Sequence, residues 1–360
     1  MKLVGEIGAS NIKVTVFESK RSKEEITFVL EHDEIMDKKK SFFEVLAVKG
    51  IDPDNITAVS FVLPFGPEKS KNPEPMKENI IDKLESLSDI YPSYIPFAVK
   101  LLRRLFKENT KIPVSLFFDT SFFLSLPLEE VFYAIPLSSS EKSKLRKFGY
   151  HGIYHSYAAC LFGKNKKVIS LVLDKKTTVC GIKNNKPLTV SLGGTPLEGI
   201  MSLTSCGDLD PGAVFYIMKK AGYSIYKMDE VLKKQSGFFG VTGYDMSMKD
   251  LAGIYGKDEK VKLAFDIYRN QILKYIGGSL AVLSGIDTIV ISGSELYSLE
   301  GLVYDILKQM NFLGIHLKES PWKKNTLLQK ISLPGSKVKV FVNYKNIADI
   351  VYSEMILADC

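Results

Sequence analysis

Apolar and polar residues alternate in two short runs at the start of the chain, Leu3 to Ile7 and Ile12 to Phe17. Such alternation puts apolar side chains on one face of a strand and polar ones on the other. The segment GASN separates the runs, and its Gly8 and Asn11 are residue types that tight turns favour. The pattern therefore predicts a β-hairpin at the start of the chain.

A similar unit recurs in the second half of the chain. Val168 to Leu173 is apolar, Asp174 to Thr177 has the composition of a turn, and Thr178 to Ile182 alternates again. Two hairpins, each at the start of one half of the chain, predict a duplicated architecture.

Other apolar runs predict strands, and helical periods predict amphipathic helices. The predicted strands cover 56–63, 114–118, 288–292 and 338–342, and the predicted helices cover 77–87, 95–106, 262–283 and 347–357. Because strands and helices alternate, we expect an α/β protein with helices on both faces of its sheets. A length of 360 residues suits two domains, and SSSEKSK near residue 140 is the expected boundary between domains at 1–140 and 141–345.

Composition excludes several classes of protein. With 45% apolar and 25% charged residues, the chain is neither disordered nor collagen-like. No apolar run approaches the roughly 18 residues of a membrane helix, and the first 20 residues lack the apolar core of a signal peptide. Four widely spaced cysteines without a CxxC motif are typical of reduced, mostly buried thiols. We therefore expect a cytoplasmic protein without a membrane partner.

The positive charge is carried almost wholly by lysine. The net charge is +7, and only five of the 48 basic residues are arginines. The lysines are spread evenly, with no arginine cluster and no stripe of aromatic and basic residues. This distribution indicates a solvated surface and disfavours a nucleic-acid partner.

Three segments could carry chemistry. Asp119 ends an apolar strand, where α/β proteins bind ligands, although it could equally be a helix N-cap. His151 and His155 would share one face of a helix, either as packed histidines or as a metal pair that lacks an obvious third ligand. The segment from Ser191 to Pro211 is rich in glycine and carboxylates, which suits either an anion-binding loop or ordinary turns.

Taken in order, six segments resemble acetate kinases and their propionate and butyrate relatives, which belong to the superfamily of acetate and sugar kinases, Hsp70 and actin. They read MKLVGEIGASNIKVTVFE, PVSLFFDTSFF, RKFGYHGIYHSYAA, LGGTPLEGIMSLTSCGDLDP, SGFFGVTGYDMSMKD and KYIGGSLAVLSGIDTIVISGSE. The resemblance implies two duplicated actin-like (ribonuclease H-like) ATPase domains that clasp a central cleft. The closing helix at 346–360 would return to the first domain. ATP and Mg²⁺ would be the cofactors, and a homodimer would form through the second domain.

The resemblance also assigns residues. Asp119 matches the catalytic aspartate, and His151 matches the histidine that contacts the transferring phosphoryl group. Tyr150 and Pro196 match the pocket for the substrate methyl group, whereas His155 matches a structural histidine. The positions that match nucleotide-binding segments are Lys13, Lys175, Lys176, Thr177, Lys249 and Gly293, and Glu6 matches a residue near the metal.

Several matched positions depart from the family pattern. Val62 and Ser205 stand where the family has two arginines, and the second phosphate loop reads VLDKKTT. Lys345 or Asn346 replaces a glutamate linked to the metal. A transition-state arginine contributes about 10³–10⁵ in rate to other phosphoryl transfers, so these changes bear directly on activity.

Two functions remain open from the sequence. The first is an acetate-kinase-like phosphotransferase that converts ATP and a short carboxylate such as acetate into ADP and an acyl phosphate. The second is a catalytically inactive homologue that binds or regulates. An active enzyme would bind a nucleotide and a small carboxylate.

Overall fold

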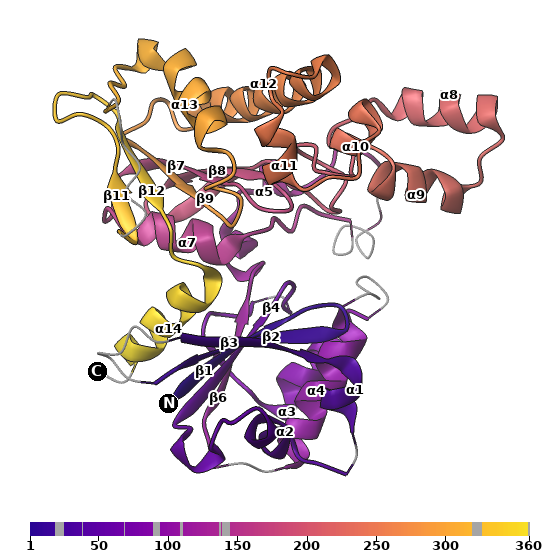
Figure 1. Cartoon of the computed structure of the whole chain (residues 1–360), viewed down its shortest axis with the longest axis vertical. Helices are drawn as coiled ribbons and strands as arrows, with labels where there is room; N and C mark the ends of the chain where they lie inside the picture. Colours follow the sequence, from indigo (N-terminus) through magenta and orange to yellow (C-terminus); the bar gives the residue numbers. More distant parts are fainter. Residues whose placement is uncertain are drawn as a thin grey trace. The chain divides into compact units, whose positions relative to one another are not determined.

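The computed structural model describes residues 1–18, 25–37, 39–67, 69–88, 94–108, 111–136, 138, 145–318 and 326–358. The chain forms two compact units, Met1–Leu124 with Ile347–Cys360, and Ser125–Asn346 (Figure 1). The boundary expected near residue 140 falls in 139–144, outside the described residues, and the units divide instead after Leu124.

The first unit contains a six-stranded sheet in the order β3-β2-β1-β4-β6-β5. β1, β2 and β3 form an antiparallel meander, and β4 and β6 run parallel to β1. The strands are β1 (Lys2–Ile7), β2 (Asn11–Phe17), β3 (Glu25–Glu31), β4 (Ala58–Leu63), β5 (Glu74–Pro75) and β6 (Val114–Phe118). The opening hairpin and the strand at 114–118 are confirmed.

The second unit repeats this topology. Its sheet has the order β9-β8-β7-β10-β12-β11, again with an antiparallel meander followed by two parallel strands and an antiparallel edge strand. The strands are β7 (Lys167–Val172), β8 (Thr178–Lys183), β9 (Lys186–Val190), β10 (Thr288–Ser292), β11 (Leu328–Lys330) and β12 (Lys339–Asn343). The predicted duplication is confirmed, because each strand of one sheet has a counterpart in the other.

Helices cover both sheets. They are α1 (His32–Met36), α2 (Phe42–Val48), α3 (Glu78–Glu85), α4 (Ile95–Lys107), α5 (Leu128–Val131), α7 (Gly152–Cys160), α8 (Pro211–Ala221), α9 (Ile225–Lys234), α10 (Gly237–Thr242), α11 (Met248–Gly253), α12 (Glu259–Val282), α13 (Glu300–Gln309) and α14 (Ile347–Ala358). Figure 1 shows α12 on one face of the second sheet and α7 on the other. α12 buries residues three and four positions apart, from Val261 and Phe265 to Ile272 and Ile276, as the predicted amphipathic pattern requires.

The last helix belongs to the first unit. α14 packs against β1, and the ring of Tyr352 stacks on Phe17 with centroids 4.0 Å apart. The Lys2 ammonium donates to the Met355 carbonyl at 2.8 Å. The C-terminal helix therefore packs on the first strands of the chain.

The thiols differ from the expectation of mostly buried cysteines. Cys180 is buried, Cys206 is half-buried and Cys160 is exposed, while Cys360 lies outside the described residues. No helix in the described ranges is long and apolar enough to cross a bilayer.

Candidate functional site

The carboxyl ends of the parallel strands in the first unit meet at one edge of its sheet. Glu6 of β1 lies beside Val62 of β4, which lies beside Phe117 of β6. Asp119 comes two residues after Phe117, directly beyond the end of β6. The predicted residues Glu6 and Asp119 are therefore at the same edge, which is where α/β sheets bind ligands.

The Asp119 backbone is fixed by its neighbours. Its N–H donates to the Leu63 carbonyl at 2.9 Å, and the Thr120 hydroxyl accepts from Gly66 N–H at 3.0 Å. The side chain of Asp119 is 6% exposed, and the element that follows is the short 3₁₀ helix Ser121–Ser125. A nearly buried carboxylate is thus held at a defined point of the ligand-binding edge.

The two other predicted residues of this unit neutralise each other. Glu6 and Lys13 are cross-strand partners in the β1–β2 hairpin, and the Lys13 ammonium lies 2.9 Å from the Glu6 carboxylate. Mg²⁺ needs an octahedral shell of oxygen ligands. Across the ranges that the structure describes, no group of three or more His, Cys, Asp or Glu side chains could hold a metal ion. Glu6 is paired with a lysine and belongs to no such group, so a Mg²⁺ ion at this edge would be held mainly by substrate phosphates and water.

The corresponding edge of the second unit brings together three predicted residues of one turn and Gly293. The turn joins β7 to β8, and its Leu173 N–H donates to the Ser292 carbonyl at the end of β10 at 2.8 Å. Gly293 has φ of 116°, and a Cβ atom there would lie 2.1 Å from the Leu173 carbonyl oxygen. Only glycine permits this close approach of the two segments.

The side chains of this turn point in different directions. Lys175 is exposed, and its N–H donates to the Asp174 carboxylate at 2.6 Å. The buried Thr177 hydroxyl bonds the Tyr268 hydroxyl of α12, so it faces the interior of the unit. The Lys176 ammonium donates to the hydroxyls of Ser202 and Ser205, the Ser202 contact being 3.2 Å. Lys176 is therefore the lysine of the turn that is drawn inward.

The two histidines share one hydroxyl partner. His151 is the N-cap of α7, with the left-handed φ of 59°, and its Nδ1 lies 3.0 Å from the Thr178 hydroxyl. His155 Nε2 lies 2.9 Å from the same hydroxyl, and His155 Nδ1 lies 2.8 Å from the Ser170 hydroxyl. A continuous polar chain thus runs from Ser170 through His155 and Thr178 to His151.

The imidazole rings of both histidines are buried and neutral. Burial lowers the pKa of His151 to about 4, although the Asp174 carboxylate acts in the opposite direction. Burial also holds the pKa of His155 well below its usual range, and the neighbouring His151 adds to this effect. At neutral pH these rings therefore offer hydrogen bonds without positive charge. Sequence spacing identified both histidines but gave no sign of Thr178, their common partner.

The carboxylates of the glycine-rich segment have hydrogen-bond or ion-pair partners within the second unit. The Asp208 carboxylate accepts from Gly199 N–H at 2.7 Å and from the Tyr275 hydroxyl. Glu198 accepts from the Tyr133 hydroxyl and lies 3.1 Å from the Lys147 ammonium. These carboxylates build the loop, and Asp210 caps α8 through Gly212 N–H at 2.8 Å.

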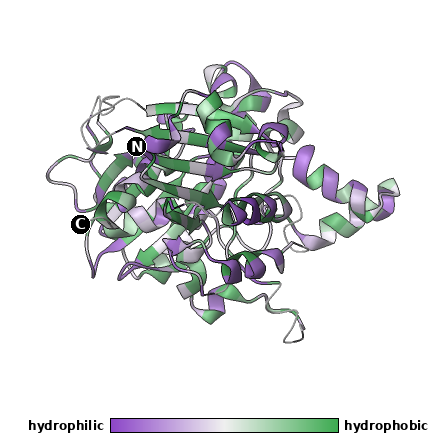
Figure 2. Cartoon of the chain, turned by 90° about the horizontal axis from the view of Figure 1, so that it is seen from below, coloured by the Kyte–Doolittle hydropathy of each residue, from purple (hydrophilic) through white to green (hydrophobic). Residues whose placement is uncertain are grey.

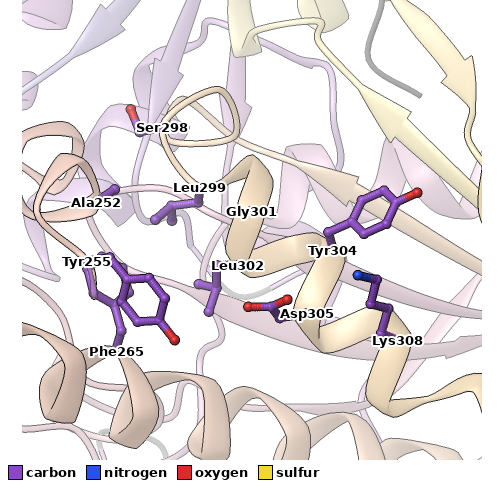
Figure 3. A pocket seen from close by; sticks show the side chains of 10 residues that line it. All are labelled: Ala252, Tyr255, Phe265, Ser298, Leu299, Gly301, Leu302, Tyr304, Asp305 and Lys308. Atoms are coloured by element: carbon purple, nitrogen blue, oxygen red, sulfur yellow. The ribbon is translucent and has the colours of Figure 1, made fainter. Parts of the chain in front are cut away.

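The remaining predicted residues are dispersed within the second unit. The Tyr150 ring lies edge-on to His151 at 4.8 Å, whereas Pro196 and Lys249 are exposed. A separate pocket of about 290 Å³ lies against α13 (Figure 3). It is lined by Ala252, Tyr255, Phe265, Ser298, Leu299, Gly301, Leu302, Tyr304, Asp305 and Lys308, so it contains none of the predicted site residues.

The two sheets have the same strand order, and each has polar side chains at the carboxyl ends of its parallel strands. This arrangement defines the class of duplicated actin-like α/β proteins. The acetokinase family model matches residues 2–351, so the chain belongs to the acetokinase family. It is 34% identical to the acetate kinase of Thermotoga maritima over 304 residues, 81% of this chain and 75% of that protein. It is 31% identical to acetate kinase 2 of Clostridium perfringens over 300 residues, 80% and 75% of the two chains.

Solved structures agree with this family. The crystal structure of Porphyromonas gingivalis acetate kinase matches with a TM-score of 0.87 and 26% identity, covering 100% of this chain and 99% of that one. The acetate kinase of Entamoeba histolytica matches in fold with a TM-score of 0.84 and 24% identity, covering 98% of each chain. Membership and fold predicted from the six sequence segments are thereby confirmed.

Proposed function

We propose that this protein is a carboxylate kinase that transfers the terminal phosphoryl group of ATP to a short carboxylate such as acetate, giving ADP and an acyl phosphate. The observation that carries the proposal is the family match over nearly the whole chain, to relatives named acetate kinase. The two polar sheet edges support it, because phosphoryl transfer depends mainly on positioning and on electrostatic stabilisation.

Each proposed catalytic residue has a role that its surroundings suit. Asp119 orients the acceptor through a carboxylate fixed at the end of β6. His151 hydrogen-bonds the phosphoryl group, and because its pKa is about 4 it remains a neutral donor at physiological pH. Lys175, Lys176 and Gly293 form the phosphate-binding edge of the second unit, and the close approach of Gly293 to Leu173 joins the turn to the end of β10.

Mg²⁺ enters this proposal with the substrate, as the magnesium complex of ATP. Glu6 is paired with Lys13, and the described residues contain no group of three or more ligating side chains that would hold the ion without the substrate. We therefore assign no catalytic step to a protein-held metal. The reaction would take place in the cytoplasm, where ATP is present.

The alternative function, an inactive homologue that binds or regulates, rests on two positions. Val62 is buried in the apolar core of the first unit, where it supplies no charge. Ser205 is a neutral hydroxyl at the other position that resembles a family arginine. These positions make direct measurement of turnover the decisive test.

The test combines binding and turnover. We expect isothermal titration to show micromolar binding of Mg-ATP and Mg-ADP. Hydroxylamine trapping should then detect acyl phosphate with acetate, propionate or butyrate, and His151→Ala should lose most of this activity. Nucleotide binding without any trapped product would support the regulatory alternative. Absence of nucleotide binding up to millimolar concentration would exclude the kinase function and leave the inactive homologue.

We also propose that the protein forms a homodimer through the second unit, as the family resemblance suggests. The α8–α9 hairpin projects from the rest of that unit (Figure 1), and apolar residues lie along it (Figure 2). Ile225 and Tyr226 are 76% and 89% exposed, and Phe215 is 69% exposed. Exposed large apolar side chains on a projecting hairpin are what an interface with a second copy of the chain would cover.

The dimer proposal predicts a change of mass on mutation. Light scattering of the natural protein should give twice the 40.3 kDa mass of the chain, and Phe215→Ser with Tyr226→Ser should give a single chain. Phe312→Ser, which changes an exposed phenylalanine elsewhere in the same unit, should leave the dimer intact. A natural protein of 40.3 kDa at micromolar concentration would contradict the proposal.

A further inference from the structure

Lys176 is a half-buried lysine whose ammonium has neutral hydrogen-bond partners. Its described contacts are the hydroxyls of Ser202 and Ser205, and no carboxylate of the described second unit forms an ion pair with it. Burial lowers the pKa of Lys176 to about 8, and the half-buried Cys206 acts weakly in the opposite direction. Buried charges in proteins are usually compensated by an opposite charge, so this lysine stands out.

The two serines form a rigid cradle. Their hydroxyls lie 2.8 Å apart, and Ser202 N–H donates to the Ser205 carbonyl at 3.0 Å. Ser202 and Ser205 are 6% and 1% exposed. A Cβ atom at Gly237 of α10 would lie 2.0 Å from the Ser202 carbonyl oxygen, so α10 packs closely on the segment from Ser202 to Ser205. The cradle therefore fixes the ammonium in place.

The fold itself does not require an inward-turned lysine at this position. The adjacent Lys175 of the same turn is exposed, as a lysine between two antiparallel strands ordinarily is. Lys176 instead turns inward beside the carboxyl ends of the parallel strands β7 and β10, where α/β sheets bind ligands. A desolvated cation without a protein counter-ion binds an anion more strongly than a solvated one does.

We propose that the Lys176 ammonium, held by Ser202 and Ser205, directly binds a phosphoryl group of the ligand and supplies the cationic charge that Ser205 itself lacks. This inference rests on the proposed function for the identity of its ligand. The same phosphoryl chemistry is offered by the nucleotide and by the acyl phosphate, and the experiment separates these two sources.

The test compares Lys176 with Lys183, an exposed lysine at the far end of β8. Lys176→Met keeps most of the side-chain length and removes the charge, and it should weaken the binding of ADP or acetyl phosphate by about 10–100-fold, the usual effect of a charge-assisted hydrogen bond. Lys183→Met, the matched control, should change either affinity by less than about 2-fold, as expected for an exposed charge away from the site. A loss confined to ADP would place Lys176 at the nucleotide, and a loss confined to acetyl phosphate would place it at the transferred group.

A rescue experiment asks whether the charge can be supplied from position 205. Because the Ser205 hydroxyl contacts the ammonium directly, an arginine there would carry its charge to the same place. Lys176→Gly alone should lose binding, and Lys176→Gly with Ser205→Arg should recover part of it. Thermal unfolding checks that each variant is folded, and the comparison of the two methionine variants stands even if the double variant does not fold.

A second readout follows from the pKa of Lys176. Sulfate keeps a constant charge from pH 7 to 9.5. The increase in unfolding temperature that it causes in the natural protein should become smaller as pH rises through about 8, because the Lys176 ammonium loses its proton. The other titratable groups around the turn are Asp174, Lys175, Cys206, Asp208, Glu295 and His151. Lys176→Met should abolish this pH dependence, while all of these other groups remain present.

The outcomes separate the two proposals. Equal binding of ADP and acetyl phosphate by Lys176→Met and the natural protein would overturn the Lys176 inference while leaving kinase activity unaffected. Sulfate stabilisation that depends on Lys176 in a protein without turnover would support the anion site and reject the kinase function. Absence of any effect of sulfate, ADP and acetyl phosphate on the natural protein would reject both.

Discussion

Asp119→Asn is expected to lower kcat for acyl phosphate formation by about 10²–10⁴-fold, the usual contribution of a positioned acid or base. The substitution keeps the shape of the side chain and the backbone bond from Asp119 N–H to the Leu63 carbonyl. It removes the negative charge and the ability to accept a proton. Because the carboxylate is 6% exposed and fixed at the end of β6, water does not replace it readily.

The matched control for this variant is Asp33→Asn, which neutralises a fully exposed carboxylate of the same unit. It should leave kcat within about 2-fold of the natural value, as surface charges usually do. Nucleotide affinity of Asp119→Asn, measured by isothermal titration, should remain close to that of the natural protein. If Asp119→Asn turns over acetate at the natural rate, Asp119 has no catalytic role.

His155→Leu is expected to lower the free energy of unfolding by about 2–4 kcal/mol, because a buried polar group left without its partner costs about 1–3 kcal/mol. The ring of His155 is fully buried and bonds the hydroxyls of Ser170 and Thr178, which are themselves fully buried. Leucine has a similar size but offers neither bond. Urea unfolding followed by circular dichroism measures the change.

His316→Leu is the control for this substitution, because His316 is an exposed histidine of the same unit. Its unfolding midpoint should match that of the natural protein. Unchanged stability of His155→Leu would show that the polar chain from Ser170 to His151 contributes nothing to folding.

The same buried histidines predict how stability depends on pH. Both pKa values lie below the unfolded value of 6.5, so the unfolded chain binds more protons than the native protein in that interval. The stabilising contribution is thus complete above pH 6.5 and is lost as pH falls through about 4. His155→Leu should show a shallower decline over this range, and an identical pH profile for the two proteins would contradict the assignment of a neutral buried ring.

The strands in which apolar and polar residues alternate were predicted well. The hairpin at the start of each half and the strands Val114–Phe118 and Thr288–Ser292 could be predicted because alternation along a strand is a property of neighbouring residues. The spacing of His151 and His155 likewise indicated a shared environment. The hairpin formed by α8 and α9 was not predicted, because its exposed apolar residues look like core residues in the sequence.

The partners of the candidate site residues could not be predicted in this way. Thr177 and Tyr268 are 91 residues apart in the chain, and Lys176 and Ser205 are 29 residues apart. From the sequence alone, Lys175, Lys176 and Thr177 had the same interpretation as nucleotide-binding residues. The structure separates them into one exposed lysine, one half-buried lysine that turns inward and one hydroxyl that faces the interior.

By itself, the sequence determined the α/β class, the duplication and the membership in the acetokinase family, because these depend on local periodicity and on the order of motifs along the chain. Only the tertiary structure decided which charges are compensated within each unit. Glu6 is paired with Lys13, and Asp208 is bound by its own loop, whereas Lys176 has only hydroxyl partners among the described residues of its unit. The physical reason is that burial and pairing arise when distant segments meet at a sheet edge, and no local pattern records which segments will meet.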